Sequence, residues 1–110
     1  GNFPLWLTPT QAIVLPISEK YQNYAEKVSQ FLNNSDIRTQ IDGRNEKAGK
    51  KIRDAEMLKV PYMLIVGERE EADQTVSVRK HGAGDLGPVS LSDFVSRVQK
   101  EVEEQLGELN

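Results

Sequence analysis

The chain has 110 residues, enough to bury one hydrophobic core but not two, so we expect a single domain over residues 1–110. Its 28% charged residues indicate a well-solvated surface, and its net charge of -3 excludes a protein coated in positive potential. The absence of cysteine from the sequence excludes disulfides, thiolate zinc ligands and a cysteine nucleophile.

The first half of the chain predicts a strand, a helix and a second strand. Residues 12–17 are a short apolar run with β-branched side chains, typical of a buried strand. Apolar side chains then recur every three or four positions over residues 21–32, as on one face of a helix, with Ser18 as its N-cap. Residues 37–42 alternate apolar and polar side chains, which predicts a less buried strand near a sheet edge.

The next stretch predicts a second helix and two more strands. An apolar stripe at helical spacing runs through residues 48–55, between charged positions. Residues 62–66 are five apolar residues in a row, which predicts a central strand covered on both faces. Residues 68–74 read as a polar connection, and the alternation over residues 75–79 predicts an antiparallel strand.

The end of the chain predicts a loop and a last helix. Residues 80–88 contain three glycines and read as a loop, and residues 90–93 resemble a capping box that starts the helix. The order of elements predicts an α/β fold: a mixed, mostly parallel sheet of about five strands with three main helices.

The glycine-rich stretch over residues 81–87 superficially resembles a dinucleotide-binding loop. Such a loop belongs between the first strand and the first helix, so simple loop flexibility is the better interpretation. His81 could serve as a general base, but no nucleophile or orienting acid stands out around it. We therefore expect no catalytic residue and no metal site in this chain.

Charge is distributed unevenly along the sequence. Residues 44–59 hold six basic and three acidic residues, whereas the last helix is acidic. A charged helix face is more often only solvated, but a locally basic helix also suits salt-sensitive contact with phosphate. If RNA is the partner, Lys51 should contact phosphate and its removal should weaken all RNAs alike.

Three stretches, residues 42–55, 60–68 and 76–79, carry a family resemblance. They read DGRNEKAGKKIRDA, VPYMLIVGE and VSVR. The chain resembles, nearly end to end, the C-terminal anticodon-binding domain of bacterial-type threonyl-tRNA synthetases, a domain shared with the class II synthetases for proline, histidine and glycine. The resemblance implies a domain that binds the anticodon loop of tRNA(Thr) and does not itself catalyse.

The same resemblance implies which residues contact the anticodon: Asn45, Arg53, Glu70 and Arg79, with Lys59 as a weaker candidate. Threonine anticodons end in guanine and uracil at their second and third positions. The pairing edge of guanine presents two adjacent donors and an acceptor. The carboxylate of Glu70 can accept from both donors, Arg79 can donate, and the amide of Asn45 can do either.

Several of these residues also have a purely structural interpretation. Asn45 could cap the second helix, and Arg53 could pair with Asp54 or Glu56. Tyr62 could stack on a base, or lie in the core or at its rim.

The resemblance further implies a longer parent enzyme, which charges tRNA with threonine using ATP, magnesium and zinc in a catalytic domain outside residues 1–110. We expect that parent to be a cytoplasmic homodimer. The opening residues 2–7 are apolar but short and contain Pro4, so we expect neither a signal peptide nor a membrane span.

Two rival interpretations remain open on the sequence alone. A receiver-like signalling domain shares the alternating elements, but residues 16–18 and 67–69 do not supply its aspartate pocket. A synthetase-like accessory protein could have kept the fold and lost its selectivity for tRNA.

Overall fold

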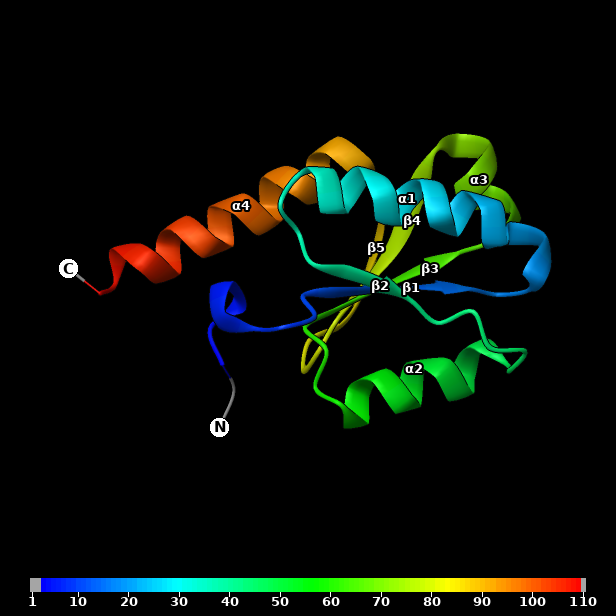
Figure 1. Ribbon diagram of the computed structural model, residues 1–110, viewed down its shortest axis with the longest axis horizontal. Helices are drawn as coiled ribbons and strands as arrows, with labels where there is room; N and C mark the ends of the chain where they lie inside the picture. The colour runs from blue at the N-terminus through cyan, green and yellow to red at the C-terminus, as the bar shows by residue number, and fades with distance from the viewer. Residues whose placement is uncertain (1–2, 110) are drawn as a thin grey trace.

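The computed structural model describes residues 3–109 and shows a five-stranded sheet with helices on both faces (Figure 1). The strands are β1 (Ala12–Pro16), β2 (Thr39–Ile41), β3 (Tyr62–Val66), β4 (Thr75–Lys80) and β5 (Gly84–Ser90), in the order β2-β1-β3-β4-β5. β1 pairs in parallel with β2 and β3, whereas β4 pairs antiparallel with β3 and β5. The mixed sheet of five strands is confirmed, and its parallel part is confined to β2, β1 and β3.

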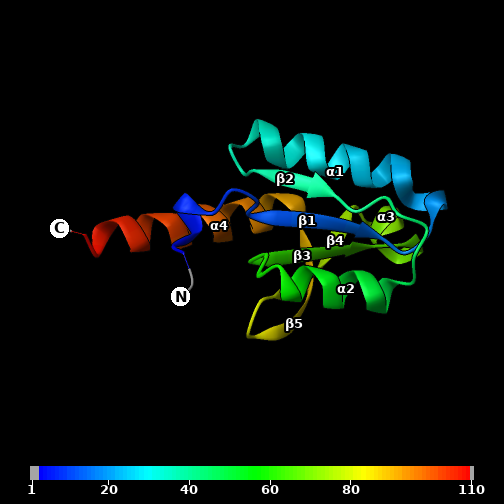
Figure 2. The ribbon, with the colours of Figure 1, turned by 60° about the horizontal axis from the view of Figure 1, so that its bottom comes forward.

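The helices lie in two layers around this sheet. They are α1 (Gln22–Asn34), α2 (Ala48–Met57), α3 (Glu68–Asp73) and α4 (Leu91–Gly107), with short 3-10 helices at Leu5–Leu7 and Glu19–Tyr21. α1 and α4 cover one face of the sheet and α2 covers the other (Figures 1 and 2). The three main helices predicted from the sequence are α1, α2 and α4. Within residues 3–109, no helix is both long and apolar enough to cross a bilayer.

The structure corrects two sequence predictions. Residues 68–74, expected as a polar connection, contain α3, at whose start the Glu70 carboxylate accepts from the Gly67 backbone N–H. Residues 80–88, expected as a loop, turn at residues 81–83 and then enter β5, whose pairing with β4 supplies the backbone hydrogen bonds. Positive φ angles at Gly84 and Gly87 bend this strand.

The larger core lies between the sheet and the α1–α4 layer. Alternate side chains of β3 and β4, including Leu64, Val76 and Val78, are fully buried there. Tyr62 is 1% exposed, packs edge-on against Phe94 with ring centroids 5.2 Å apart, and donates its hydroxyl hydrogen to Glu101. Burial, and then the bond to Glu101, raise the pKa of Tyr62. Tyr62 is therefore a core residue, and the interpretation that it stacks on a base is wrong.

A smaller core lies under α2. Leu15 and Met63 pack against Ala55 and Val60, with Ile52 partly buried beside them. This is the narrow apolar seam that the spacing predicts, and it leaves both flanks of α2 open to solvent.

The topology also separates this fold from a receiver-like domain. Doubly wound signalling domains share the order 2-1-3-4-5 but are built on a parallel sheet. Here β4 and β5 run antiparallel, and their connection is a tight turn instead of a helix. The receiver-like interpretation is wrong.

Candidate nucleic-acid interface

Helix α2 divides its face of the sheet into two flanks. Lys51 and Asp54 line a depression together with Ile41 of β2, so they mark the flank toward β2. On the other side, Glu56 Oε2 lies 2.7 Å from Nδ1 of His81, which follows β4. Arg53 precedes Glu56 by three residues and therefore shares the flank toward β4.

Glu70 lies at the start of α3 and turns its carboxylate toward β4. Its Oε1 accepts from the Gly67 backbone N–H at 2.9 Å, and its Oε2 accepts from the Ser77 hydroxyl at 3.1 Å. Ser77 pairs with Ile65, whose side chain belongs to the small core under α2. Glu70 therefore lies beside the α2 face, and each of its oxygens keeps a lone pair for a ligand.

Arg79 lies two residues after Ser77 on β4, so it projects from the same face of the sheet. Arg79 pairs regularly with Met63 of β3, and the register shift between β4 and β5 leaves its extra residue, Leu86, on β5. Within residues 3–109, the buried Nε of Arg79 has no hydrogen-bond partner. A buried donor without an acceptor is costly, so an acceptor on a ligand would stabilise it.

Asn45 lies in the loop between β2 and α2, which we name the 42–47 loop. Its neighbours close a tight turn in which the Glu46 N–H donates to the Arg44 carbonyl at 2.9 Å, and Asn45 itself is exposed. The N-cap of α2 is Lys47, so the interpretation of Asn45 as that cap is wrong.

Arg53 is exposed, and across the described part of the chain it forms no ion pair with Asp54 or Glu56. The interpretation that Arg53 pairs with Asp54 or Glu56 is therefore wrong, and its guanidinium is open to a ligand.

The topology brings Asn45 and Glu70 to the same edge of the sheet. The start of α2 lies by the carboxyl end of β1, because Lys51 Nζ donates to the Pro16 carbonyl at 2.9 Å. Gly67 and Glu70 follow the carboxyl end of β3, where Val66 pairs with Pro16. Parallel strands commonly bind ligands at this edge. Lys59 is apart from this group, because it follows the other end of α2 and lines a depression with His81 and Lys80.

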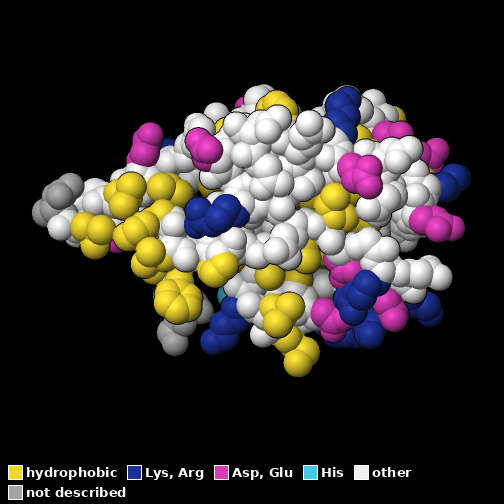
Figure 3. Space-filling model, in the orientation of Figure 1, with side chains coloured by type: hydrophobic (Ala, Val, Ile, Leu, Met, Phe, Trp, Pro, Cys, Tyr) yellow, Lys and Arg dark blue, Asp and Glu magenta, His cyan; other side chains and the backbone are white. Residues whose placement is uncertain are grey.

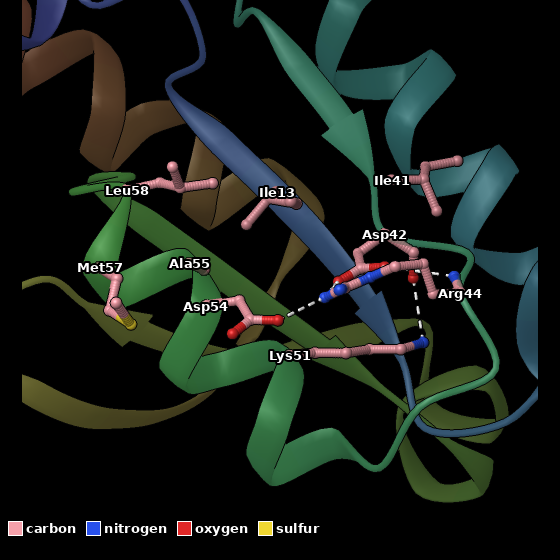
Figure 4. Close-up of a pocket in the computed structure, with 9 residues that line it drawn as sticks. All are labelled: Ile13, Ile41, Asp42, Arg44, Lys51, Asp54, Ala55, Met57 and Leu58. Atoms are coloured by element: carbon pink, nitrogen blue, oxygen red, sulfur yellow. Dashed lines mark hydrogen bonds and ion pairs between the residues drawn. The ribbon is translucent and has the colours of Figure 1, made fainter.

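The basic side chains of residues 44–59 are less available to a ligand than the composition of this segment indicates. Lys51 is only 2% exposed, and its ammonium donates to the backbone carbonyl of Pro16 and to that of Asp42, the second of which Figure 4 shows. The prediction that Lys51 contacts phosphate is therefore wrong. Lys51 lies three residues after Ala48 and four before Ala55, so helical spacing places it on the apolar stripe of α2, whereas Lys50 lies off that stripe.

Arg44 is also engaged within the protein. Its guanidinium lies 2.8 Å from both Asp42 Oδ2 and Asp54 Oδ2. Hydrogen bonding from Arg44 lowers the pKa of Asp42 below its usual value. Figure 3 shows the resulting mixture of acidic and basic side chains over the start of α2. Exposed positive charge without an ion pair, within residues 3–109, is left along this segment at Lys47, Arg53 and Lys59.

The described residues offer no cluster of three histidine or acidic side chains that could hold a metal ion. The chemistry available at the α2 face is hydrogen bonding and charge: two guanidinium groups, one carboxylate and one amide, supplied by four separate segments.

Comparisons with known proteins agree on one family. Residues 11–101 match the family model described as anticodon binding domain. A threonine-tRNA ligase from Porphyromonas gingivalis is 53% identical over 106 residues, which cover 96% of this chain and 16% of that protein. One from Flavobacterium johnsoniae is 57% identical over 108 residues, with 96% and 17% covered. The chain thus spans about a sixth of the length of the curated relatives it matches.

Two solved structures share the fold. The RNA binding domain of threonyl-tRNA synthetase from Cryptosporidium parvum superposes with a TM-score of 0.86 at 33% identity, over 92% of this chain and 26% of that chain. The prolyl-tRNA synthetase of the same organism gives a TM-score of 0.80 at 25% identity, over 96% and 23%.

Proposed function

Because the chain belongs to the anticodon-binding domain family, we propose that it binds the anticodon loop of tRNA(Thr) as part of a threonyl-tRNA synthetase. The names of its relatives support the choice of threonine, since those matched over 96% of this chain are threonine-tRNA ligases. One observation carries the proposal: Glu70 and Arg79 lie on the same face of the sheet. The Glu70 oxygens each keep a free lone pair, and the buried Nε of Arg79 has no hydrogen-bond partner among residues 3–109.

Together, Glu70 and Arg79 suit the pairing edge of an unstacked guanine. The Glu70 carboxylate accepts from the two adjacent donors of the base, and Arg79 donates to its acceptor. Asn45, at the edge of the same face, has an amide that can donate to or accept from the neighbouring uracil. Arg53 contacts the sugar-phosphate path, and Lys59 adds a peripheral phosphate contact.

We place the remaining chemistry of the parent enzyme outside this chain. The parent attaches threonine to its tRNA, and ATP, magnesium and zinc bind to segments beyond residues 1–110. Apolar side chains that lie exposed around the amino-terminal 3-10 helix and the end of α4 support a contact with the rest of the synthetase (Figure 3). They include Phe3 at 74%, Leu7 at 51% and Leu109 at 68% exposure. A homodimeric parent and a cytoplasmic location stay predictions.

Fluorescence anisotropy with two labelled hairpins tests the proposal. One carries a threonine anticodon loop, and the other differs only by adenine in place of guanine at the second anticodon position. The chain should bind the first hairpin more tightly by roughly 5- to 150-fold, as for one base-edge contact. Equal affinity for both hairpins would contradict the proposal and would favour an accessory protein without selectivity.

A further inference from the structure

The 42–47 loop, which carries Asn45, is attached to the sheet by a buried lysine. Lysine is rarely buried unless it is paired, and Lys51 is 2% exposed. Its ammonium donates to the Pro16 carbonyl at 2.9 Å and to the Asp42 carbonyl at 3.0 Å. These carbonyls belong to the end of β1 and to the first residue of the loop. The bonds offset part of the cost of burying the charge. They add to the bond by which the Asp42 N–H donates to the Val14 carbonyl of β1 at 2.9 Å.

A second set of contacts fixes the same loop from the solvent side. The Asp42 carboxylate accepts from the Arg44 backbone N–H at 3.2 Å and from Arg44 Nε at 2.9 Å. The far end of the guanidinium reaches Asp54 on α2 at 2.8 Å (Figure 4). The residue after Asn45 is tied back as well, since the Glu46 N–H donates to the Arg44 carbonyl. Asn45 is therefore the exposed tip of a turn whose two sides are both held.

We propose that Lys51 is a positioning residue for anticodon reading, which acts through Asn45 and touches no RNA itself. The inference rests on the proposed function, in which Asn45 contacts a base. Lys51 holds the Asp42 carbonyl at the start of the loop, and Arg44 holds the loop to Asp54 of α2. A shift of about 1 Å in a positioned group can cost up to on the order of a hundredfold in a geometry-dependent process, so a loosened loop should lose discrimination.

A purely structural role would give a different result. α2 is already held to the sheet by Ile52, Ala55 and Val60, independently of the ammonium of Lys51. Lys51→Met keeps the apolar stem and removes the charged group, which relieves the burial of a charge but leaves the Pro16 and Asp42 carbonyls without this donor. The matched control is Lys100→Met, which removes the same charge from an exposed position on α4, on the other face of the sheet.

The experiment combines amide hydrogen exchange without RNA and binding of two hairpins. One is the threonine hairpin, and the other, the third-position hairpin, differs from it only by cytosine in place of uracil, the base that Asn45 is proposed to contact. In Lys51→Met, exchange in the 42–47 loop should become faster and the preference for the threonine hairpin over the third-position hairpin should fall, each on the order of tenfold. Lys100→Met should leave both the exchange and the preference unchanged. Added to Asn45→Ala, Lys51→Met should cause no further loss of preference, because both changes remove the same contact.

Arg44→Met serves as a second variant in case Lys51→Met does not fold. Arg44 has a side chain that is 49% exposed, so its removal spares the core, and it should show the same non-additivity with Asn45→Ala. Unchanged loop exchange, a preference kept in Lys51→Met, or losses that add to those of Asn45→Ala would overturn the inference. Equal binding, by the unmodified chain, of the threonine hairpin and the hairpin with adenine at the second anticodon position would instead count against the proposed function.

Discussion

Glu70→Gln separates two roles of this side chain: its hydrogen bonds within the protein and its proposed contact with a base. In the folded chain the carboxylate caps α3 through the Gly67 N–H and accepts from the Ser77 hydroxyl. A glutamine keeps an oxygen for Gly67, and its amide nitrogen can donate to the Ser77 oxygen. It cannot accept from both donors of a guanine, so the substitution removes a base contact and preserves the internal bonds.

The expected loss is one charge-assisted base-edge contact, about 1–3 kcal/mol of discrimination, or roughly 5- to 150-fold in relative affinity. The free energy of unfolding should fall much less, by about 0.3–1 kcal/mol, because one negative charge leaves the first turn of α3. Glu71→Gln is the matched control, since it removes the same charge from the same turn at an exposed position.

The assay measures the affinity of each variant for the threonine hairpin and for the hairpin with adenine at the second position. Glu70→Gln should reduce the ratio of the two affinities, and Glu71→Gln should leave that ratio unchanged. If both variants change the ratio alike, or if Glu70→Gln weakens both hairpins by the same factor, Glu70 does not read the base.

Three further predictions concern the fold. Lys59→Gly should raise the free energy of unfolding by about 0.5–1 kcal/mol, because Lys59 has a left-handed φ of 58°. A denaturant titration that shows no gain would contradict this. Phe94→Ala should cost about 3–5 kcal/mol, because the ring is fully buried against Tyr62. A loss under 1 kcal/mol in the same titration would mean that the core repacks easily. The lowered pKa of Asp42, caused by Arg44, stabilises the fold above the usual aspartate pKa of about 4, and this contribution disappears as the pH falls through the lowered value. The stability difference between the unmodified chain and Asp42→Asn should therefore shrink below about pH 4, and a constant difference down to pH 2 would refute the assignment.

Local patterns predicted the elements that bury a continuous apolar face. The run over residues 62–66 and the stripe through α2 both appear in the structure as β3 and the small core beneath α2. β5 was missed because glycine, proline and aspartate interrupt it, and its partner β4 supplies what its own sequence does not. α3 was missed because six residues are too few for a periodic signal.

Prediction of the candidate site from local sequence patterns has the same limit. Glu70 and Arg79 were identified by family resemblance, and their placement on one face follows from the register of β4 against β3. Helical spacing places Lys51 on the apolar stripe of α2, but the two carbonyls that accept from its buried ammonium could not be predicted, since one of them lies 35 residues earlier in the chain. Sequence spacing alone describes which residues share a helix face, not which face the rest of the chain will cover.

Chemical-shift mapping of the chain with the unlabelled threonine hairpin tests the central claim most directly. We predict that chemical-shift changes concentrate at Asn45, Arg53, Glu70 and Arg79, around α2 and the adjoining part of β4. The face covered by α1 and α4 should stay unchanged. Shifts confined to the α1–α4 face, or spread evenly over the surface, would contradict the account.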